Sequence, residues 1–94
     1  MDNNKTITPR SGLALHRVGT NYMVVDAGND NIDLVDVYTL NESAALLWDE
    51  ASKGGRTIVQ LAEALAEEYG ISLERAIADV TRQADEWLEM GMVE

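Results

Sequence analysis

Residues 38–48 read YTLNESAALLW, and the character of the chain changes within this stretch. Before it, turn residues separate short runs of β-branched and apolar side chains, a pattern typical of strands. Inside it, Asn41 precedes Glu42 and Ser43, which predicts a helix start, because an Asn side chain accepts a hydrogen bond from an otherwise unpaired N–H of the first turn. After it, apolar residues recur at three- and four-residue spacing, as along one face of a helix. The stretch therefore divides a β half from an α half.

The β half is predicted to contain three strands, at residues 13–18, 22–26 and 32–40. The turn Gly19-Thr20-Asn21 separates the first two, and the Gly- and Asn-rich residues 28–31 separate the second from the third. Because short turns join antiparallel neighbours, the strands should form a meander. Residues 1–9 are polar and are predicted to be a flexible N-terminal segment, which leaves a domain over residues 10–94.

The α half is predicted to contain three helices. Asn41, Thr57 and Ser72 stand at cap positions, and glycines stand where the helices should end. The apolar stripes of the last two helices consist of Ile58, Leu61, Ala62, Leu65 and Tyr69, and of Leu73, Ile77, Val80, Ala84, Trp87 and Leu88. The fold class is therefore α+β, with a three-stranded antiparallel β-meander followed by a three-helix bundle.

The composition narrows the function classes. The chain has 94 residues, enough for one domain, and its net charge is −10. This charge disfavours nucleic acid and anionic membrane surfaces, because both recruit Lys and Arg. It favours solubility or a partner with basic segments. With no apolar run of membrane-spanning length and no signal-like N-terminus, the protein is expected to be cytoplasmic, without membrane partners.

Catalytic and metal-binding motifs find no support in the sequence. It contains one histidine, His16, and no cysteine, so no zinc cluster or Cys nucleophile is expected. The run from Asp26 to Asp33 lacks the Gly and Glu positions of a calcium loop, and Gly54-Gly55 lacks the ending of a phosphate-binding loop. We therefore expect no enzyme, no metal and no cofactor, and a function carried by a binding surface.

Several motifs resemble the PqqD-like family. Residues 38–48 are similar to the segment after that family's third strand, where a Leu-Asn pair precedes a small-residue turn of helix and a bulky apolar residue. The segment from Thr57 to Tyr69 looks like the family's second helix, and Asp79-Val80 and Trp87-Leu88, followed by residues 91–93, look like its last helix and tail. The similarity covers about residues 9–94 and rests on the order and spacing of these motifs.

The resemblance implies a winged helix-turn-helix-like fold and a non-catalytic role as a peptide chaperone. PqqD-like proteins are RiPP recognition elements: the leader of a ribosomally made precursor peptide adds as a strand to the edge of the third strand, and a partner enzyme, often a radical-SAM protein, modifies the core peptide. The implied strand edge is Asp33, Leu34, Val35, Asp36, Val37, Tyr38 and Thr39. The implied helix wall is Arg75, Ile77, Ala78, Thr81, Arg82 and Asp85.

The sequence also departs from the family members of the pyrroloquinoline quinone pathway. It lacks their Pro-Glu-Gly turn before the third strand, and Trp48 replaces a smaller aliphatic residue, which favours another peptide-maturation system.

Two other functions stay open. A winged-helix DNA-binding domain suits the architecture, but the third helix has two arginines against five acids between residues 74 and 89. A structural module that pairs its edge strand with a second copy is the other; a monomer or weak dimer is expected.

Overall fold

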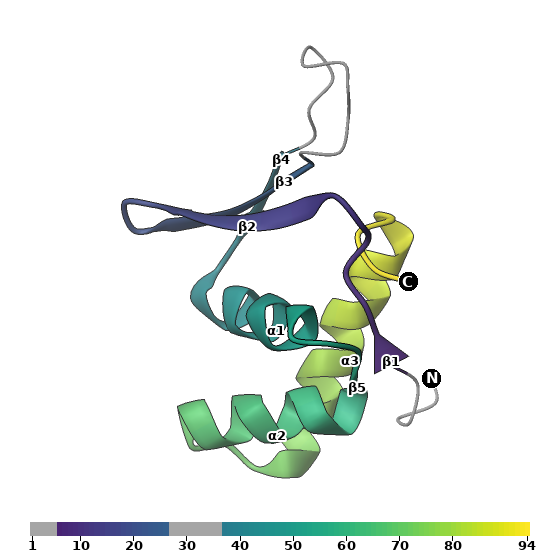
Figure 1. The fold of residues 1–94 in the computed structure, drawn as a ribbon. Helices are drawn as coiled ribbons and strands as arrows, with labels where there is room; N and C mark the ends of the chain where they lie inside the picture. The colour runs from purple at the N-terminus through teal and green to yellow at the C-terminus, as the bar shows by residue number, and fades with distance from the viewer. Residues whose placement is uncertain (1–5, 27–36) are drawn as a thin grey trace.

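The computed structural model describes residues 6–26 and 37–94 and confirms the predicted order of strands and helices (Figure 1). The strands are β1 (Thr6–Ile7), β2 (Leu13–Val18), β3 (Asn21–Asp26), β4 (Val37–Leu40) and β5 (Arg56–Thr57). The helices are α1 (Glu42–Ser52), α2 (Ile58–Tyr69) and α3 (Leu73–Glu89). None of the described helices is long and apolar enough to cross a membrane.

Strands β2, β3 and β4 form an antiparallel sheet in that order, as the predicted meander requires. Leu15 pairs with Val24, and Val24 pairs with Tyr38. The first turn is shorter than predicted, because Asn21 belongs to β3; Gly19, with φ +64°, occupies the first of two loop positions. Of the predicted third strand, residues 37–40 form β4, and residues 32–36 lie outside the described part of the chain.

The three helices begin at the predicted caps. The Asn41 Oδ1 atom accepts a hydrogen bond from the Ala44 N–H at 2.8 Å. Thr57 and Gln60 form a reciprocal capping box, with bonds of 2.9 and 3.1 Å, and the Ser72 hydroxyl accepts a bond from the Arg75 N–H. These bonds satisfy N–H groups that the first turn of each helix leaves unpaired. The sequence signals for the α half are therefore confirmed in atomic detail.

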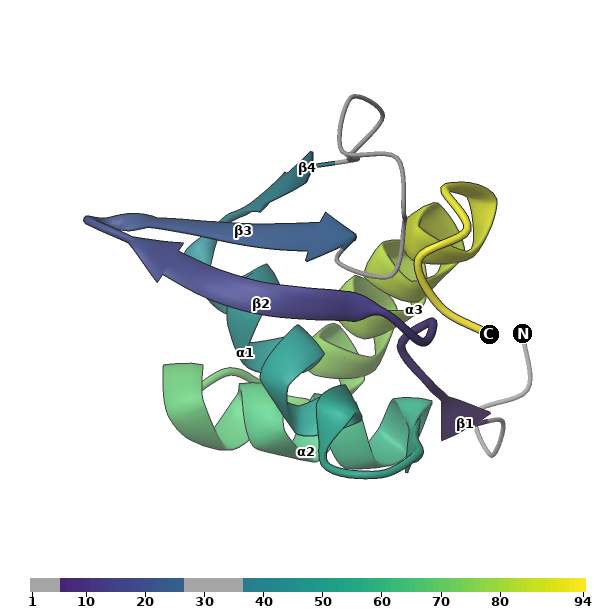
Figure 2. The same cartoon turned by 45° about the horizontal axis from the view of Figure 1, so that its top comes forward.

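The core lies between the sheet and the helices, where Figure 2 shows the sheet lying across α1 and α3. Its centre is a pair of tryptophans, Trp48 of α1 and Trp87 of α3, whose rings meet edge to face at 5.1 Å. The buried stripe of α3 consists of Ala76, Val80, Ala84 and Trp87. Tyr69 and Leu73, which were predicted to lie on apolar stripes, are 42% and 43% exposed.

The N-terminal segment differs from expectation. Residues 6–9 were predicted to belong to a flexible lead-in, but Ile7 is fully buried and β1 pairs with β5. Thr8 and Glu94 exchange two backbone hydrogen bonds, of 3.3 and 2.8 Å, so this segment runs beside the C-terminal tail. Ile7 is a single apolar residue between polar neighbours. The polar composition of the segment therefore gave no indication that Ile7 would be buried.

Candidate functional site

The edge of β4 is the first element of the candidate site. Within the described residues, β4 pairs with β3 on one side only, so its other side presents backbone N–H and C=O groups to a further strand. Tyr38 is half-buried and Thr39 is exposed on this strand. The opposite edge of the sheet is β2, whose last three residues are exposed and include Arg17. Of the two edges, only β4 leads directly into a helix cap, at Asn41.

A groove of about 400 Å³ opens between β4 and α3. The C-terminal half of α3 reaches the level of the sheet (Figure 1). Trp87 and Met92 are 2% and 0% exposed and form an apolar floor, whereas Glu86 and Met90 are exposed at the rim. The lining is Tyr38, Thr39, Leu40, Asn41, Ala44, Gln83, Glu86, Trp87, Met90 and Met92.

The C-terminal tail is held in the groove floor by the way α3 ends. Gly91 has φ +75°, a conformation that favours glycine, and its N–H donates to the Leu88 carbonyl at 3.1 Å. The Met92 N–H donates to the Trp87 carbonyl at 2.9 Å, which completes a Schellman motif. The chain therefore turns back under α3, and Met92 is placed beside Trp87 instead of continuing into solvent.

A second hollow of about 310 Å³ continues the groove along α3, since both are lined by Asn41, Ala44 and Gln83. Its rim holds Arg75 and Arg82, whose side chains are 72% and 80% exposed. Both arginines approach Asp79, at 4.0 and 3.7 Å, distances that give weak surface ion pairs. The long trough formed by the two hollows thus has an acidic residue, Glu86, at one end and two arginines at the other.

The structure brings together some of the predicted site residues and separates others. Tyr38 and Thr39 line the groove, and Arg75 and Arg82 line its continuation. Val37 belongs to β4, and its backbone lies on the predicted edge. Asp33, Leu34, Val35 and Asp36 lie outside the described residues.

The other predicted α3 residues lie away from the groove. A helix turns about 100° per residue, so positions 78, 81 and 85 lie about 140–160° around the axis from Gln83. Ala78 and Asp85 are exposed, and Ile77 packs against the core. Their role in binding stays a prediction, and none of the four lines the groove beside β4.

The residues that form this wall were not predicted from the sequence. Gln83 and Glu86 lie on one face of α3, Met90 caps its C-terminal end, and Trp87 lies beneath them. These residues are three and four positions apart and lie next to the buried stripe of α3. A mixture of polar and apolar residues beside an apolar stripe marks the edge of a packed helix face, and this pattern could have indicated the wall. Among the residues that the structure describes, no group of three His, Cys, Asp or Glu side chains could hold a metal ion.

The fold and the site define a class: a small α+β domain whose free strand edge faces a helix across a groove. The family model for coenzyme PQQ synthesis protein D (PqqD) matches residues 23–93, which is more than half of the chain. The chain therefore belongs to the PqqD family, as the sequence resemblance indicated.

A solved structure has the same fold. It is described as lasso peptide synthetase B1 complexed with the leader peptide, and it aligns with a TM-score of 0.73. The alignment covers 94% of this chain and 96% of that chain at 19% sequence identity. The α+β architecture predicted from the sequence is thereby confirmed. A search of curated proteins found no match.

Proposed function

We propose that this protein is a non-catalytic peptide-binding module that captures the leader of a ribosomally made precursor peptide. The observation that carries the proposal is the edge of β4, which opens into a groove walled by α3. Membership of the PqqD family supports it, and so does the likeness to lasso peptide synthetase B1 complexed with the leader peptide.

Strand addition explains how such a groove would bind a peptide. The peptide backbone would pair with the free edge of β4, which gives affinity largely independent of sequence. Alternate side chains of a strand point to opposite faces, so every second residue of the peptide would point toward α3. There the floor formed by Trp87 and Met92 suits an apolar side chain, and Glu86 and Gln83 suit polar neighbours.

The bound peptide would then be presented to an enzyme that modifies its core. We propose a peptide-modifying partner such as a radical-SAM protein, and a pathway other than pyrroloquinoline quinone synthesis, because the family's Pro-Glu-Gly turn is missing here. The described residues offer a binding surface, and the reaction would belong to the partner.

The test is an NMR titration of the isotope-labelled protein with a precursor peptide encoded beside its gene. Amide signals of Tyr38, Thr39, Gln83 and Glu86 should shift together. Gln83→Trp, which fills the groove, should weaken binding by about tenfold or more, the effect expected when a well-packed contact is lost. Ala78→Trp adds the same side chain to an exposed position on another face of α3 and should leave affinity unchanged.

Two outcomes would refute the proposal. If the peptide produced no shifts in β4 at millimolar concentration, strand addition there would be wrong. If Ala78→Trp weakened binding as much as Gln83→Trp, the binding face of α3 would be the one that the sequence implied, and the groove described above would not be the site.

DNA binding is the alternative that the charge disfavours. α3 contains Arg75 and Arg82 as its only cations, against Glu74, Asp79, Asp85, Glu86 and Glu89. Non-specific DNA affinity comes from cations that neutralise phosphates, and this helix would repel them. Duplex DNA should therefore show no salt-dependent binding at concentrations where the precursor peptide saturates the protein.

A further inference from the structure

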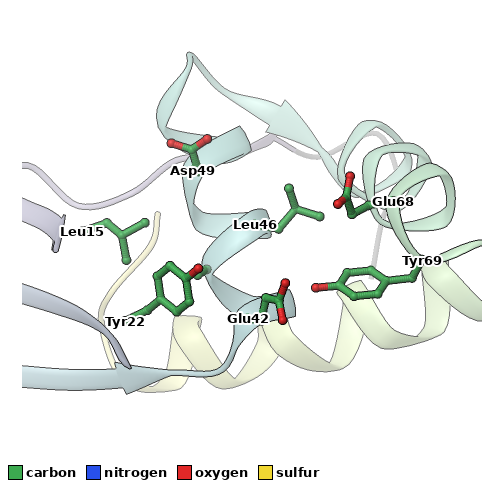
Figure 3. Close-up of a pocket in the computed structure, with 8 residues that line it drawn as sticks. Leu15, Tyr22, Glu42, Leu46, Asp49, Glu68 and Tyr69 are labelled. Atoms are coloured by element: carbon green, nitrogen blue, oxygen red, sulfur yellow. The ribbon is translucent and has the colours of Figure 1, made fainter. Parts of the chain in front are cut away.

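A pocket of about 260 Å³ lies beneath the sheet, beside α1 (Figure 3). It shares no lining residue with the groove between β4 and α3. Leu15 of β2 and Tyr22 of β3 form its sheet side, and the remaining residues come from α1 and the end of α2. We call it the acidic pocket. It is lined by Leu15, Tyr22, Glu42, Ala45, Leu46, Asp49, Glu68 and Tyr69.

The acidic pocket combines an apolar floor with a negative rim. Ala45 is buried and Leu46 is partly buried against the core, and Figure 3 shows the Leu46 side chain in the middle of the pocket. Glu42, Asp49 and Glu68 are exposed around it, and none of the lining residues is a cation. A ligand that fills this pocket would therefore need an apolar part and a positive charge.

The carboxylates of the rim have little charge compensation within the protein. Asp49 lies 4.0 Å from Lys53, but both side chains are more than half exposed, so this ion pair is weak. Glu42 and Glu68 have no ion pair among residues 6–26 and 37–94. Glu42 also stands in the first turn of α1, where the helix dipole favours a carboxylate. That structural reason does not extend to Asp49 or Glu68.

The pKa of Tyr69 reflects the negative potential in the pocket. Its hydroxyl points toward the Glu42 carboxylate (Figure 3). The pKa of Tyr69 is raised, first by partial burial and then by the charges of Glu42 and Glu68. The Arg17 guanidinium carbon lies 5.8 Å from the centre of the Tyr22 ring, so a cation of the protein itself already stands beside this side of the pocket. The uncompensated negative charge therefore lies on the Tyr69 side, at Glu42 and Glu68.

We propose that the acidic pocket receives an arginine or lysine side chain from a basic segment of a second protein. Such a side chain has an aliphatic stem that fits the floor and a cation that fits the rim. The volume is below the roughly 300–1,000 Å³ of small-molecule sites, which favours a side chain over a cofactor. The net charge of −10 argues against a second copy of this chain as the partner.

This proposal goes beyond peptide capture in the groove. Asn41 and Ala44 of α1 line the groove, whereas Glu42, Ala45 and Asp49 line the acidic pocket, on a neighbouring face about 100° around the helix. The two sites therefore do not compete for space on α1. A peptide in the groove and a basic segment in the acidic pocket would be bound at the same time.

The test uses a blocked basic tetrapeptide, acetyl-Leu-Arg-Leu-Arg-amide, in an NMR titration of the full chain. Signals of Glu42, Leu46, Glu68 and Tyr69 should shift. The double variant Glu42→Gln/Glu68→Gln should weaken binding about fivefold, as the loss of two exposed ion pairs would. The matched control, Glu63→Gln/Glu67→Gln on the exposed face of α2, changes the net charge equally and should leave the affinity unchanged.

Equal weakening by both double variants, or shifts spread over every acidic surface, would overturn the proposal, because the peptide would then be responding to net charge alone. A thermal melt of each variant checks that it is folded. Leu46→Lys, which places a cation in the pocket, should also abolish the shifts; unchanged binding by that variant would contradict the proposal. Signals of Tyr38 and Thr39 report the groove separately, so failure here leaves peptide capture untouched.

Discussion

The groove and the acidic pocket flank the same helix, but the sheet meets them differently. The edge strand β4 forms one side of the groove, so its free backbone groups can form hydrogen bonds with a strand that binds there. A face of the sheet lines the acidic pocket, and there Leu15 and Tyr22 contribute side chains only. A strand can therefore dock in the groove, whereas the acidic pocket suits a single side chain. This difference follows from strand order more than from the residue types around either hollow.

Truncating Trp87 in the floor of the groove should destabilise the protein much more than truncating Leu46 in the floor of the acidic pocket. Trp87, under the groove, is 2% exposed and packs edge to face on Trp48, so Trp87→Ala should cost about 3–5 kcal/mol of unfolding free energy. Leu46, in the acidic pocket, is only partly buried, and Leu46→Ala should cost less than about 2 kcal/mol. Chemical denaturation measures both. Similar losses would mean that the two floors belong equally to the core.

Asn41 lies between the groove and the acidic pocket. It lines the groove and caps α1, and the first residue of that helix, Glu42, lines the acidic pocket. Asn41→Ala removes the acceptor of the Ala44 N–H bond and should cost about 1 kcal/mol. Asn41→Asp keeps an acceptor at the same position and should be nearly neutral. Thermal or chemical unfolding compares the two variants, and an equal loss in both would show that the side-chain oxygen is not what stabilises this helix start.

Salt should separate the two sites. Binding of the basic tetrapeptide depends on exposed charges, so its affinity should fall severalfold between about 0.1 and 1 M salt, as the screening length shrinks from about 10 to 3 Å. Binding of the precursor peptide depends on strand pairing and apolar burial and should change by less than about twofold. Titration calorimetry at both salt concentrations measures this. A strong salt dependence in the groove would imply that charge, and not the strand edge, dominates there.

The smallest effect should be the ionisation of Tyr69. Its raised pKa means that the folded protein holds the phenolic proton more tightly than the unfolded chain does. Any contribution to stability is therefore complete below the usual pKa of about 10 and is lost as the pH rises through the folded value. Ultraviolet titration should show one tyrosine ionising late. Tyr69→Phe should remove that step, and Glu42→Gln should move it to lower pH; an unshifted step would contradict the electrostatic cause.

The sequence was most informative where local chemistry decides the structure. The caps at Asn41, Thr57 and Ser72 and the strand-to-helix boundary were predicted because each depends on side chains within three residues of the cap. The burial of Ile7 and the pairing of Thr8 with Glu94 were not, because they join opposite ends of the chain. No local pattern carries that information.

The groove shows the same division between local and long-range information. Tyr38 and Thr39, which the family resemblance implied as part of the binding edge, do line the groove. Ala78, Thr81 and Asp85, which the resemblance also implied, do not line this groove, and their role in binding stays a prediction. The face of α3 that meets β4 could not be read from the sequence, because the rotation of a helix about its axis depends on its packing partners. Trp87 and Ala84 fix that rotation by burying themselves beneath the sheet and α1, and only then do Gln83 and Glu86 become the wall.

The most direct test of strand addition is a set of isotope-filtered NOE measurements on the labelled protein with unlabelled precursor peptide. If the peptide adds to β4, it should show backbone contacts to residues 37–40 at the regular spacing of a fourth strand in the β2–β3–β4 sheet, together with side-chain contacts to Trp87 and Met90. Slower exchange of the β4 amides with solvent should accompany them. Peptide contacts confined to β2 or to the outer faces of the helices, with β4 unchanged, would rule out strand addition at β4.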